Sequence, residues 1–138
     1  MYGAVLLGSF NPETGKYYPV SKVGTGFSDE TLDIIYKKLS PVASTQIPKE
    51  YDSITKVKPS FWIPPKQVFE IEFDSFSISP MYKIGSDKIM GGGISLRFPR
   101  FVKFRDDKRP DQSTSVEQLI SLYLESAEQS GAGDESTN

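Results

Sequence analysis

The chain of 138 residues contains no cysteine and no histidine, and these two absences exclude several classes of chemistry. Without cysteine there are no disulfides, thiolate nucleophiles or cysteine-ligated zinc sites. Without histidine there is no Ser-His-Asp or Cys-His catalysis and no usual general base near neutral pH. Any reaction that involves this chain must therefore use lysine, arginine, carboxylate or hydroxyl groups.

Long apolar runs and a large net charge are also lacking. The N-terminal apolar run, residues 4–7, is far shorter than the roughly 20 residues of a spanning helix, and it is too short for a signal peptide. We therefore expect no membrane partner. The net charge of −2, taken alone, argues against a nucleic-acid binder. That figure averages two unlike segments, however, because residues 97–109 hold six basic and two acidic residues while residues 125–138 hold four acids and no base.

The first part of the chain predicts a hairpin and a helix. Residues 3–23 suit a β-hairpin around the turn-forming sequence Asn-Pro-Glu-Thr-Gly at 11–15. A helix should begin after Ser28, a good N-cap, and end before Pro41. Its apolar stripe has helical spacing and consists of Leu32, Ile35, Tyr36 and Leu39.

The middle of the chain predicts a long connection followed by two strands. Residues 41–65 hold five of the ten prolines, so we expect a partly extended connection that Trp62 fixes to the body. Residues 68–76 alternate between apolar and acidic side chains, as a strand with one wet face does. The acids of that face suit either solvation, which we favour, or a hard cation; they are Glu70, Glu72 and Asp74. A second strand is expected over 94–105, with Ser95, Arg97, Lys103 and Arg105 on one face.

A capping box at 114–117 predicts a last helix. Beyond it the composition changes to serine, glycine, alanine and acids, so we expect a domain over 1–125 and an acidic disordered tail over 126–138. Short strands with one helix inserted midway favour a mainly β fold, a small Greek-key barrel of the OB type with a C-terminal helix. Only four strands are evident, against the five of such a barrel.

The basic segment 97–109 is the candidate site. Arginine and lysine neutralise phosphates, and its interleaved phenylalanines could stack on bases or enter a minor groove. A solvated strand with core phenylalanines would show the same pattern. Pro99 cannot donate to a β-ladder, so a bulge there would re-aim Phe98 or Phe101.

Four ordered stretches of the chain resemble the C-terminal region of ATP-dependent DNA ligases, most closely the DNA ligase I branch. The most specific is Gly-Ile-Ser-Leu-Arg-Phe-Pro-Arg-Phe at 93–101, followed by Arg-Asp-Asp-Lys at 105–108. The stretches at 22–30 and 77–83 and the helix before Tyr123 agree in the same order. The resemblance covers about residues 2–124, and it implies the OB-fold domain that follows the nucleotidyltransferase domain.

The resemblance implies a division of labour among the basic residues. Arg105, Asp107 and Lys108 would form the last nucleotidyltransferase motif, in which Arg105 and Lys108 hold the phosphates of ATP and Asp107 orients them. The residues that would contact DNA are Arg97, Phe98, Arg100 and Lys103, with Phe98 in the minor groove beside a nick. A core position for Phe98 is the alternative, because strict alternation places it beside Leu96.

The whole enzyme would seal nicks in duplex DNA through enzyme-AMP and DNA-adenylate intermediates, in replication, repair and recombination. It would use ATP and Mg²⁺ mostly through the nucleotidyltransferase domain of the same protein, with no metal site in this chain. The resemblance also implies a monomer, located in the nucleus if the source is eukaryotic and in the cytoplasm otherwise.

The chain also lacks parts of the family pattern. It contains no Lys-x-Asp-Gly motif and no Asp-Gly pair, so we expect that it cannot become adenylated or seal nicks alone. The match begins inside the domain, which implies that the first OB strand is absent and that the domain is truncated at its N-terminal edge. A non-catalytic OB module that binds single strands by stacking is the alternative function, and a partner-docking domain is a third.

Overall fold

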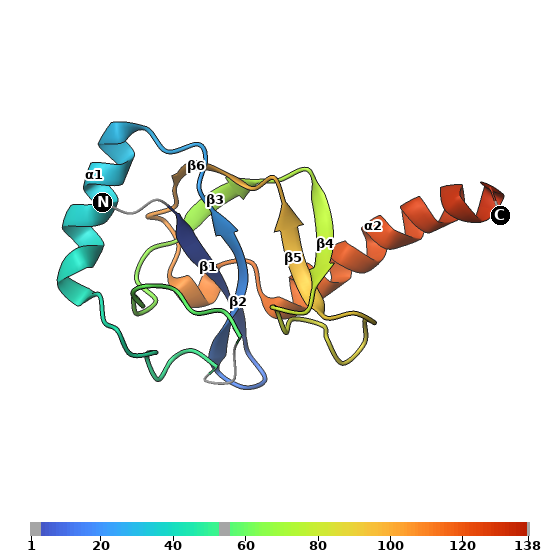
Figure 1. Ribbon diagram of the computed structural model, residues 1–138, viewed down its shortest axis with the longest axis horizontal. Helices are drawn as coiled ribbons and strands as arrows, with labels where there is room; N and C mark the ends of the chain where they lie inside the picture. Colours follow the sequence, from blue (N-terminus) through green and yellow to red (C-terminus); the bar gives the residue numbers. More distant parts are fainter. Residues whose placement is uncertain (1–3, 53–55, 138) are drawn as a thin grey trace.

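The computed structural model describes residues 4–52 and 56–137, and within them the strands form three antiparallel two-stranded sheets (Figure 1). The first sheet pairs β1 (Val5–Asn11) with β2 (Lys16–Val23). The expected hairpin over 3–23 is therefore confirmed, although its residue Gly3 lies outside the described residues. The left-handed φ of 72° at Gly15 closes its turn, a conformation that glycine adopts without steric cost.

Helix α1 (Asp29–Leu39) follows the hairpin, as its capping pattern predicts. The Ser28 side chain accepts a hydrogen bond from the Thr31 backbone N–H, which caps the helix. Ile35 and Leu39 are buried, whereas Tyr36 is 47% exposed. The predicted apolar stripe is therefore too wide, since the side of α1 that carries Tyr36 faces outward.

The connection after α1 is irregular and anchored by aromatic contacts. The backbone of Ser44 exchanges two hydrogen bonds with that of Trp62, at 2.8 and 2.6 Å. The Trp62 ring lies 5.7 Å from that of Tyr51, whose hydroxyl donates to the Ile63 carbonyl at 2.9 Å. Ser44, Tyr51 and Ile63 all belong to the connection itself, and the Tyr51 ring lies 5.8 Å from that of Tyr17 on β2. Trp62 therefore fixes the connection to the body through Tyr51 rather than directly, and residues 53–55 lie outside the described part.

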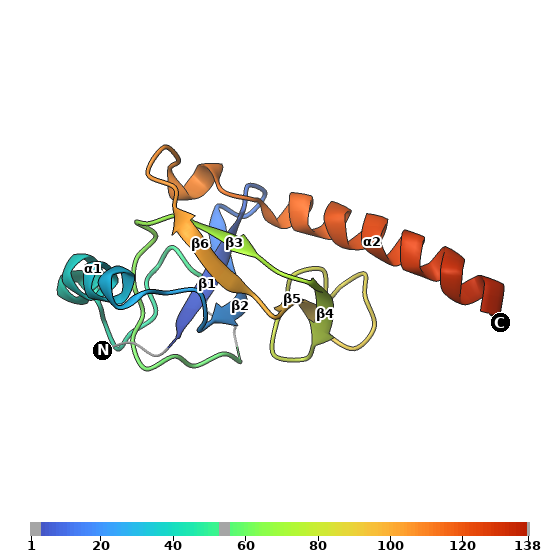
Figure 2. The ribbon, with the colours of Figure 1, turned by 90° about the horizontal axis from the view of Figure 1, so that it is seen from above.

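The sequence predicts one strand over 68–76 and another over 94–105, and both predictions are wrong because each region is interrupted in the structure. The first divides into β3 (Phe69–Glu72) and β4 (Ser75–Ser79), and the second into β5 (Gly93–Arg97) and β6 (Arg100–Phe104). Sheet β3–β6 pairs Glu72 with Arg100, and sheet β4–β5 resumes three residues later with Ser75 opposite Arg97. The four strands therefore form one antiparallel hairpin that bends in its middle; β3 and β6 run side by side in Figure 2.

The bend has a local cause in each arm of this hairpin. Pro99 has no N–H to offer a ladder, and Phe98 before it adopts a φ of 55°, which an extended strand does not contain. On the opposite arm the ladder stops at Phe73 and Asp74. Alternation of side chains predicts where strands lie, but not where a pair of strands turns together.

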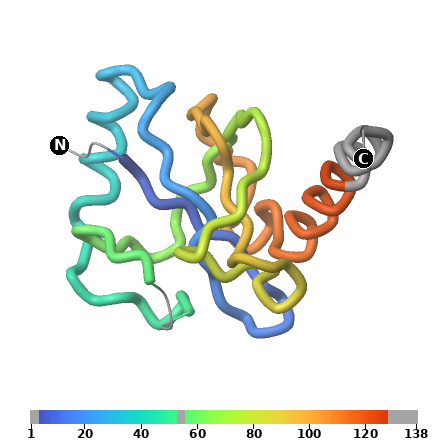
Figure 3. The backbone as a smooth tube through the Cα atoms, turned by 45° about the vertical axis from the view of Figure 1, so that its right-hand side comes forward, coloured from blue at the N-terminus to red at the C-terminus, as the bar shows by residue number. Residues whose placement is uncertain are grey.

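The core lies between the first hairpin, the bent hairpin and the start of α2 (Val116–Thr137). Figure 3 shows the course of the backbone through these elements. Its buried residues are Val20, Ile84, Ile94, Val116 and Leu119. The cap of α2 is one residue later than predicted: the Ser115 hydroxyl accepts from the Gln118 N–H, and the Gln118 side chain accepts from the Ser115 N–H. Ser-x-x-Gln satisfies a capping box as well as the predicted Thr-x-x-Glu does.

Helix α2 leaves the body after its first turns and projects away from it (Figures 1 and 2). Residues 126–137 are helical in the structure, where the sequence predicts disorder. Ala127, Glu128 and Gln129 are good helix formers, so they continue the hydrogen-bond ladder of α2. The proposed division between residues 125 and 126 stays a prediction, and Asn138 lies outside the described residues.

These elements confirm the expected class, a small mainly β domain of the OB type with one helix inserted after its first hairpin and one at its end. Within the described residues, no helix combines the length and the apolar character that a membrane span requires.

Candidate nucleic-acid interface

The turn between β5 and β6 presents the phenylalanine that the sequence places at the centre of the site. Phe98 is 65% exposed, so the alternative of a core position is wrong. Phe101 takes the core position instead, stacked on Phe27 with ring centroids 4.9 Å apart and edge-on to Phe69 at 5.3 Å. The turn at residues 98–99 therefore separates one outward ring from one inward ring.

The same turn changes the predicted strand face. Ser95 is buried, whereas Arg97 and Lys103 are exposed. Ser95 therefore does not share a solvent-exposed face with Arg97 and Lys103, as the sequence predicts it should. The Arg97 guanidinium lies over the Phe98 ring, 5.6 Å from its centroid. An exposed aromatic ring with a cation on it thus forms the tip of the turn.

The Arg100 guanidinium contacts two carboxylates and a carbonyl, whereas the Arg97 guanidinium lies over an aromatic ring. Arg100 Nη1 donates to Asp74 Oδ1 at 3.0 Å and to the Phe98 carbonyl at 2.9 Å, and its Nη2 lies 3.5 Å from Glu72 Oε1. Its side chain remains 41% exposed. Glu72 of β3 and Asp74 at the bend therefore pair with Arg100 of β6. Sequence reasoning missed this arrangement because it depends on the register of the strands.

A second group forms where β6 ends. Arg105 donates from Nε and Nη2 to the two carboxylate oxygens of Asp107, at 2.9 and 2.8 Å, and from Nη1 to Glu70 Oε1 at 3.2 Å. The Lys108 N–H donates to the Arg105 carbonyl at 3.3 Å, which folds residues 105–108 into a turn. The structure thus brings Arg105 and Asp107 into direct contact and leaves the Lys108 side chain exposed beside them.

This contact changes the acid–base properties of both partners. The hydrogen bonds that Arg105 donates to Asp107, and then the charge of Asp107, raise the pKa of Arg105 above its ordinary value. The hydrogen bond from Arg105 is the largest influence on Asp107 and lowers the pKa of that carboxyl to about 2. Asp107 is consequently an anion at neutral pH, suited to orienting a guanidinium rather than to transferring a proton.

The glycine-containing loop after β2 supports the turn and does not resemble a phosphate cradle. Gly26 has a φ of 90°, and a Cβ built there would lie 2.3 Å from the Phe101 carbonyl oxygen. The Thr25 carbonyl accepts from the Phe101 N–H at 2.9 Å, and the Thr25 hydroxyl donates to the Pro99 carbonyl at 3.0 Å. These contacts give residues 24–26 a structural role, because they fix the backbone of the β5–β6 turn.

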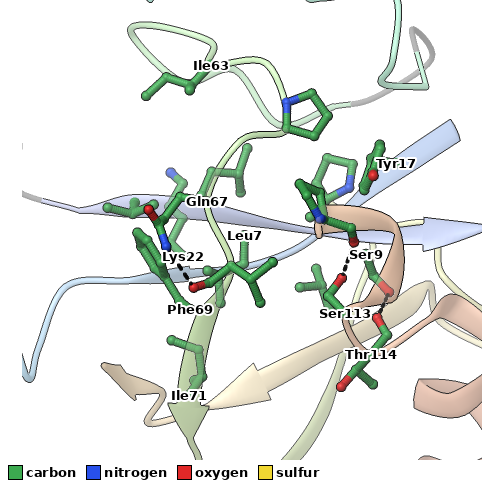
Figure 4. Close-up of a pocket in the computed structure, with 18 of the residues that line it drawn as sticks. Leu7, Ser9, Tyr17, Lys22, Ile63, Gln67, Phe69, Ile71, Ser113 and Thr114 are labelled. Atoms are coloured by element: carbon green, nitrogen blue, oxygen red, sulfur yellow. Dashed lines mark hydrogen bonds between the residues drawn. The ribbon is translucent and has the colours of Figure 1, made fainter. Parts of the chain in front are cut away.

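A cavity of about 880 Å³ lies between the first hairpin and the segment before β3 (Figure 4). Leu7, Phe69 and Ile71 form part of its apolar wall. Ser9 donates to the Thr114 carbonyl at 2.7 Å at the end near α2. Arg105 and Lys108 also line it, so the second basic group faces a hollow surface as well as solvent.

The donors present fit phosphate rather than a metal ion. Arg105 is a partly exposed cation whose guanidinium donates to Asp107 and Glu70, and Lys108 is an exposed cation beside it. Cations of this kind suit phosphate oxygens. In the described part of the chain, no three acidic side chains are placed to hold a metal ion.

Comparisons with known proteins show the family of the chain. Residues 1–108 match the family model described as ATP dependent DNA ligase C terminal region. DNA ligase 1 of Saccharomyces cerevisiae is 38% identical over 122 residues, which cover 88% of this chain and 16% of the yeast protein. DNA ligases of the archaea Staphylothermus marinus and Pyrobaculum islandicum are 37% and 38% identical, over 88% and 89% of this chain and 20% and 21% of their own lengths. The chain thus spans about a fifth or less of these relatives, and it belongs to the family formed by the C-terminal region of ATP-dependent DNA ligases.

Proposed function

We propose that this chain acts within a DNA ligase as the domain that binds nicked duplex DNA and contributes to the adenylation step. The observation that carries the proposal is the turn at residues 97–100, where an exposed phenylalanine lies under an arginine at the bend of the second hairpin. A ring in this position can enter a minor groove while neighbouring cations neutralise phosphates.

The DNA-binding roles follow the geometry of the turn. Arg97 and Lys103 have exposed side chains, so both can approach phosphates directly. Arg100 contacts two carboxylates, so it would support the turn more than it would bind DNA. Phe98 would fill a gap beside the nick, where the duplex bends at the least cost.

The adenylation role belongs to the group at the end of β6. Arg105, oriented by Asp107, and Lys108 would bind the β- and γ-phosphates of ATP and offset the charge that builds on pyrophosphate as it leaves. Mg²⁺ would act through ATP and the nucleotidyltransferase domain. Without a Lys-x-Asp-Gly motif the chain alone would form no covalent AMP-lysine, which incubation with radiolabelled ATP would test.

The DNA role is tested by fluorescence anisotropy with this chain and three probes of equal length: a nicked duplex, the intact duplex and a single strand. We expect the nicked duplex to bind most tightly and Phe98→Ala to reduce that preference. Phe61→Ala is the matched control, because Phe61 is another half-exposed phenylalanine, in the connection after α1. Equal or tighter binding to the single strand would instead favour a stacking module.

A further inference from the structure

Three successive carbonyl groups in the turn that presents Phe98 accept hydrogen bonds from three different donors. The Arg97 carbonyl accepts from the Asp74 N–H at 3.0 Å. The Phe98 carbonyl accepts from Arg100 Nη1 at 2.9 Å, and the Pro99 carbonyl accepts from the Thr25 hydroxyl at 3.0 Å. Two of these donors come from segments far away in the sequence.

The two supports of this turn, Asp74 and Thr25, lie on opposite sides of it. Asp74, at the bend of the other arm, contacts Arg97 through its backbone and Arg100 through its carboxylate. Thr25, after β2, contacts Pro99 through its hydroxyl and Phe101 through its carbonyl. None of these side-chain contacts belongs to the ladders that form the sheets.

Such support has a physical reason. Phe98 adopts a φ of 55°, a region that strains a residue with a side chain, and the surroundings must offset this strain. The side chain gains little burial in return, because it is 65% exposed. A strained backbone that exposes an apolar ring to solvent does not stabilise the fold. We therefore attribute this conformation to contact with a partner.

We infer that Thr25 and the Asp74–Arg100 pair are positioning residues, which hold the turn so that the Phe98 ring is already oriented for duplex DNA. This inference rests on the proposed DNA role of Phe98. A turn held in advance loses less conformational entropy when DNA binds, so the supports contribute to affinity only through the ring that they orient.

Thr25→Val tests the first support without a change of charge or shape. The variant loses the hydrogen bond to Pro99 and keeps the backbone bond to Phe101. We expect affinity for the nicked duplex to fall by about 2- to 10-fold, the range that one hydrogen bond provides. In a Phe98→Ala background the same substitution should have no effect, which a double-mutant cycle measures. The matched control is Thr14→Val, which removes a hydrogen-bonded hydroxyl from the turn of the first hairpin.

The outcomes separate this inference from the proposed function. An equal loss in both backgrounds would overturn the inference, because Thr25 would then act on binding without Phe98. No loss for Thr25→Val beside a clear loss for Phe98→Ala would overturn the inference and leave the proposed function standing. If Phe98→Ala itself left binding unchanged, the DNA role of Phe98 would fail, and the positioning role with it.

The second support needs a control for charge, because Asp74 is an anion near the proposed DNA surface. Asp74→Ala and Glu72→Ala each remove one carboxylate beside Arg100, but only Asp74 hydrogen-bonds to that arginine. Both variants should bind intact duplex more tightly, since repulsion falls. We expect Asp74→Ala alone to lower the ratio of nicked to intact affinity. An equal ratio in the two variants would overturn the role of Asp74.

Discussion

At the scale of single residues, arginines that lie close together in the sequence have different contact partners in the structure. Arg97 lies on an exposed ring, Arg100 contacts two carboxylates, and Arg105 is oriented by a third. The basic character of the segment was predictable from composition. The contact of Arg105 with Asp107 was predicted from the resemblance. The acids of the other arm were not predicted as partners, because Glu70, Glu72 and Asp74 lie 26 to 35 residues earlier and reach the arginines only through the register of β3 on β6.

Asp107 provides a prediction about pH. Its pKa is lowered to about 2 by the hydrogen bond from Arg105, so its contact favours the folded state above the ordinary carboxyl pKa and is lost as pH falls toward 2. A carboxyl-carbon NMR titration of the wild-type chain should place the transition of Asp107 near pH 2. Arg105→Gln should move it upward toward 3.8, the ordinary value. Arg109→Gln is the control, because Arg109 contacts Asp111 instead, and an upward shift in that variant would contradict this account.

At the scale of elements, local signals predicted the first hairpin and α1, because turn chemistry and capping act over a few residues. The bent hairpin was not predicted, because the alternation over 68–76 continues through Phe73 while its partner strand changes direction at Phe98. The candidate site lies at this bend. The residue types of the site were therefore predictable, whereas its shape depends on a turn that two strands make together.

The loop at residues 24–26 provides a test of how closely the elements pack. Gly26→Ala places a Cβ 2.3 Å and 2.6 Å from the oxygen and nitrogen of Phe101, in addition to the cost of a left-handed φ. We expect a loss of stability of about 2–4 kcal/mol in urea unfolding. Gly15→Ala is the matched control: its φ is 72°, but no atom lies within 4 Å of the new Cβ. Its cost should be about 1–2 kcal/mol, and equal losses would contradict the packing argument.

The projecting part of α2 provides a second test at this scale. The core contacts of the helix come from its first turns, through Val116 and Leu119. A chain that ends at residue 125 should therefore unfold at the same temperature as the full chain, within about 2 °C, as followed by circular dichroism of the β signal. A larger decrease would show that residues 126–138 belong to the folded domain, against the predicted boundary.

At the scale of the whole molecule, the distribution of charge matters more than its sum. The net charge is −2, and residues 126–138 contribute three acids and no base, while exposed cations are spread along much of the chain. Glu72 and Asp74 pair with Arg100, and Glu70 and Asp107 pair with Arg105. At this face we therefore expect Arg97, Lys103 and Lys108 to attract phosphates at short range, because charges farther away are screened beyond about a Debye length of 10 Å.

The salt dependence of DNA binding measures how many cations take part. If Arg97 and Lys103 meet phosphates while Arg100 stays with its carboxylates, the logarithm of affinity should fall against that of salt concentration with a slope of roughly −2. Lys103→Ala should reduce the slope by about one. The control is Lys37→Ala, because Lys37 pairs with Asp33 on α1. A slope near zero would contradict electrostatic binding and favour a partner-docking domain.

The bent hairpin also bears on how the chain folds. Each strand of the structure pairs with one that lies at most about 35 residues away, so both hairpins can form from contacts near in sequence. The longer links, such as Ser9 to Thr114 and Thr25 to Pro99, join units that already exist. Assembly would then proceed by docking one preformed hairpin onto the other, and the left-handed turn at Phe98 would reach its final conformation only when that docking is complete.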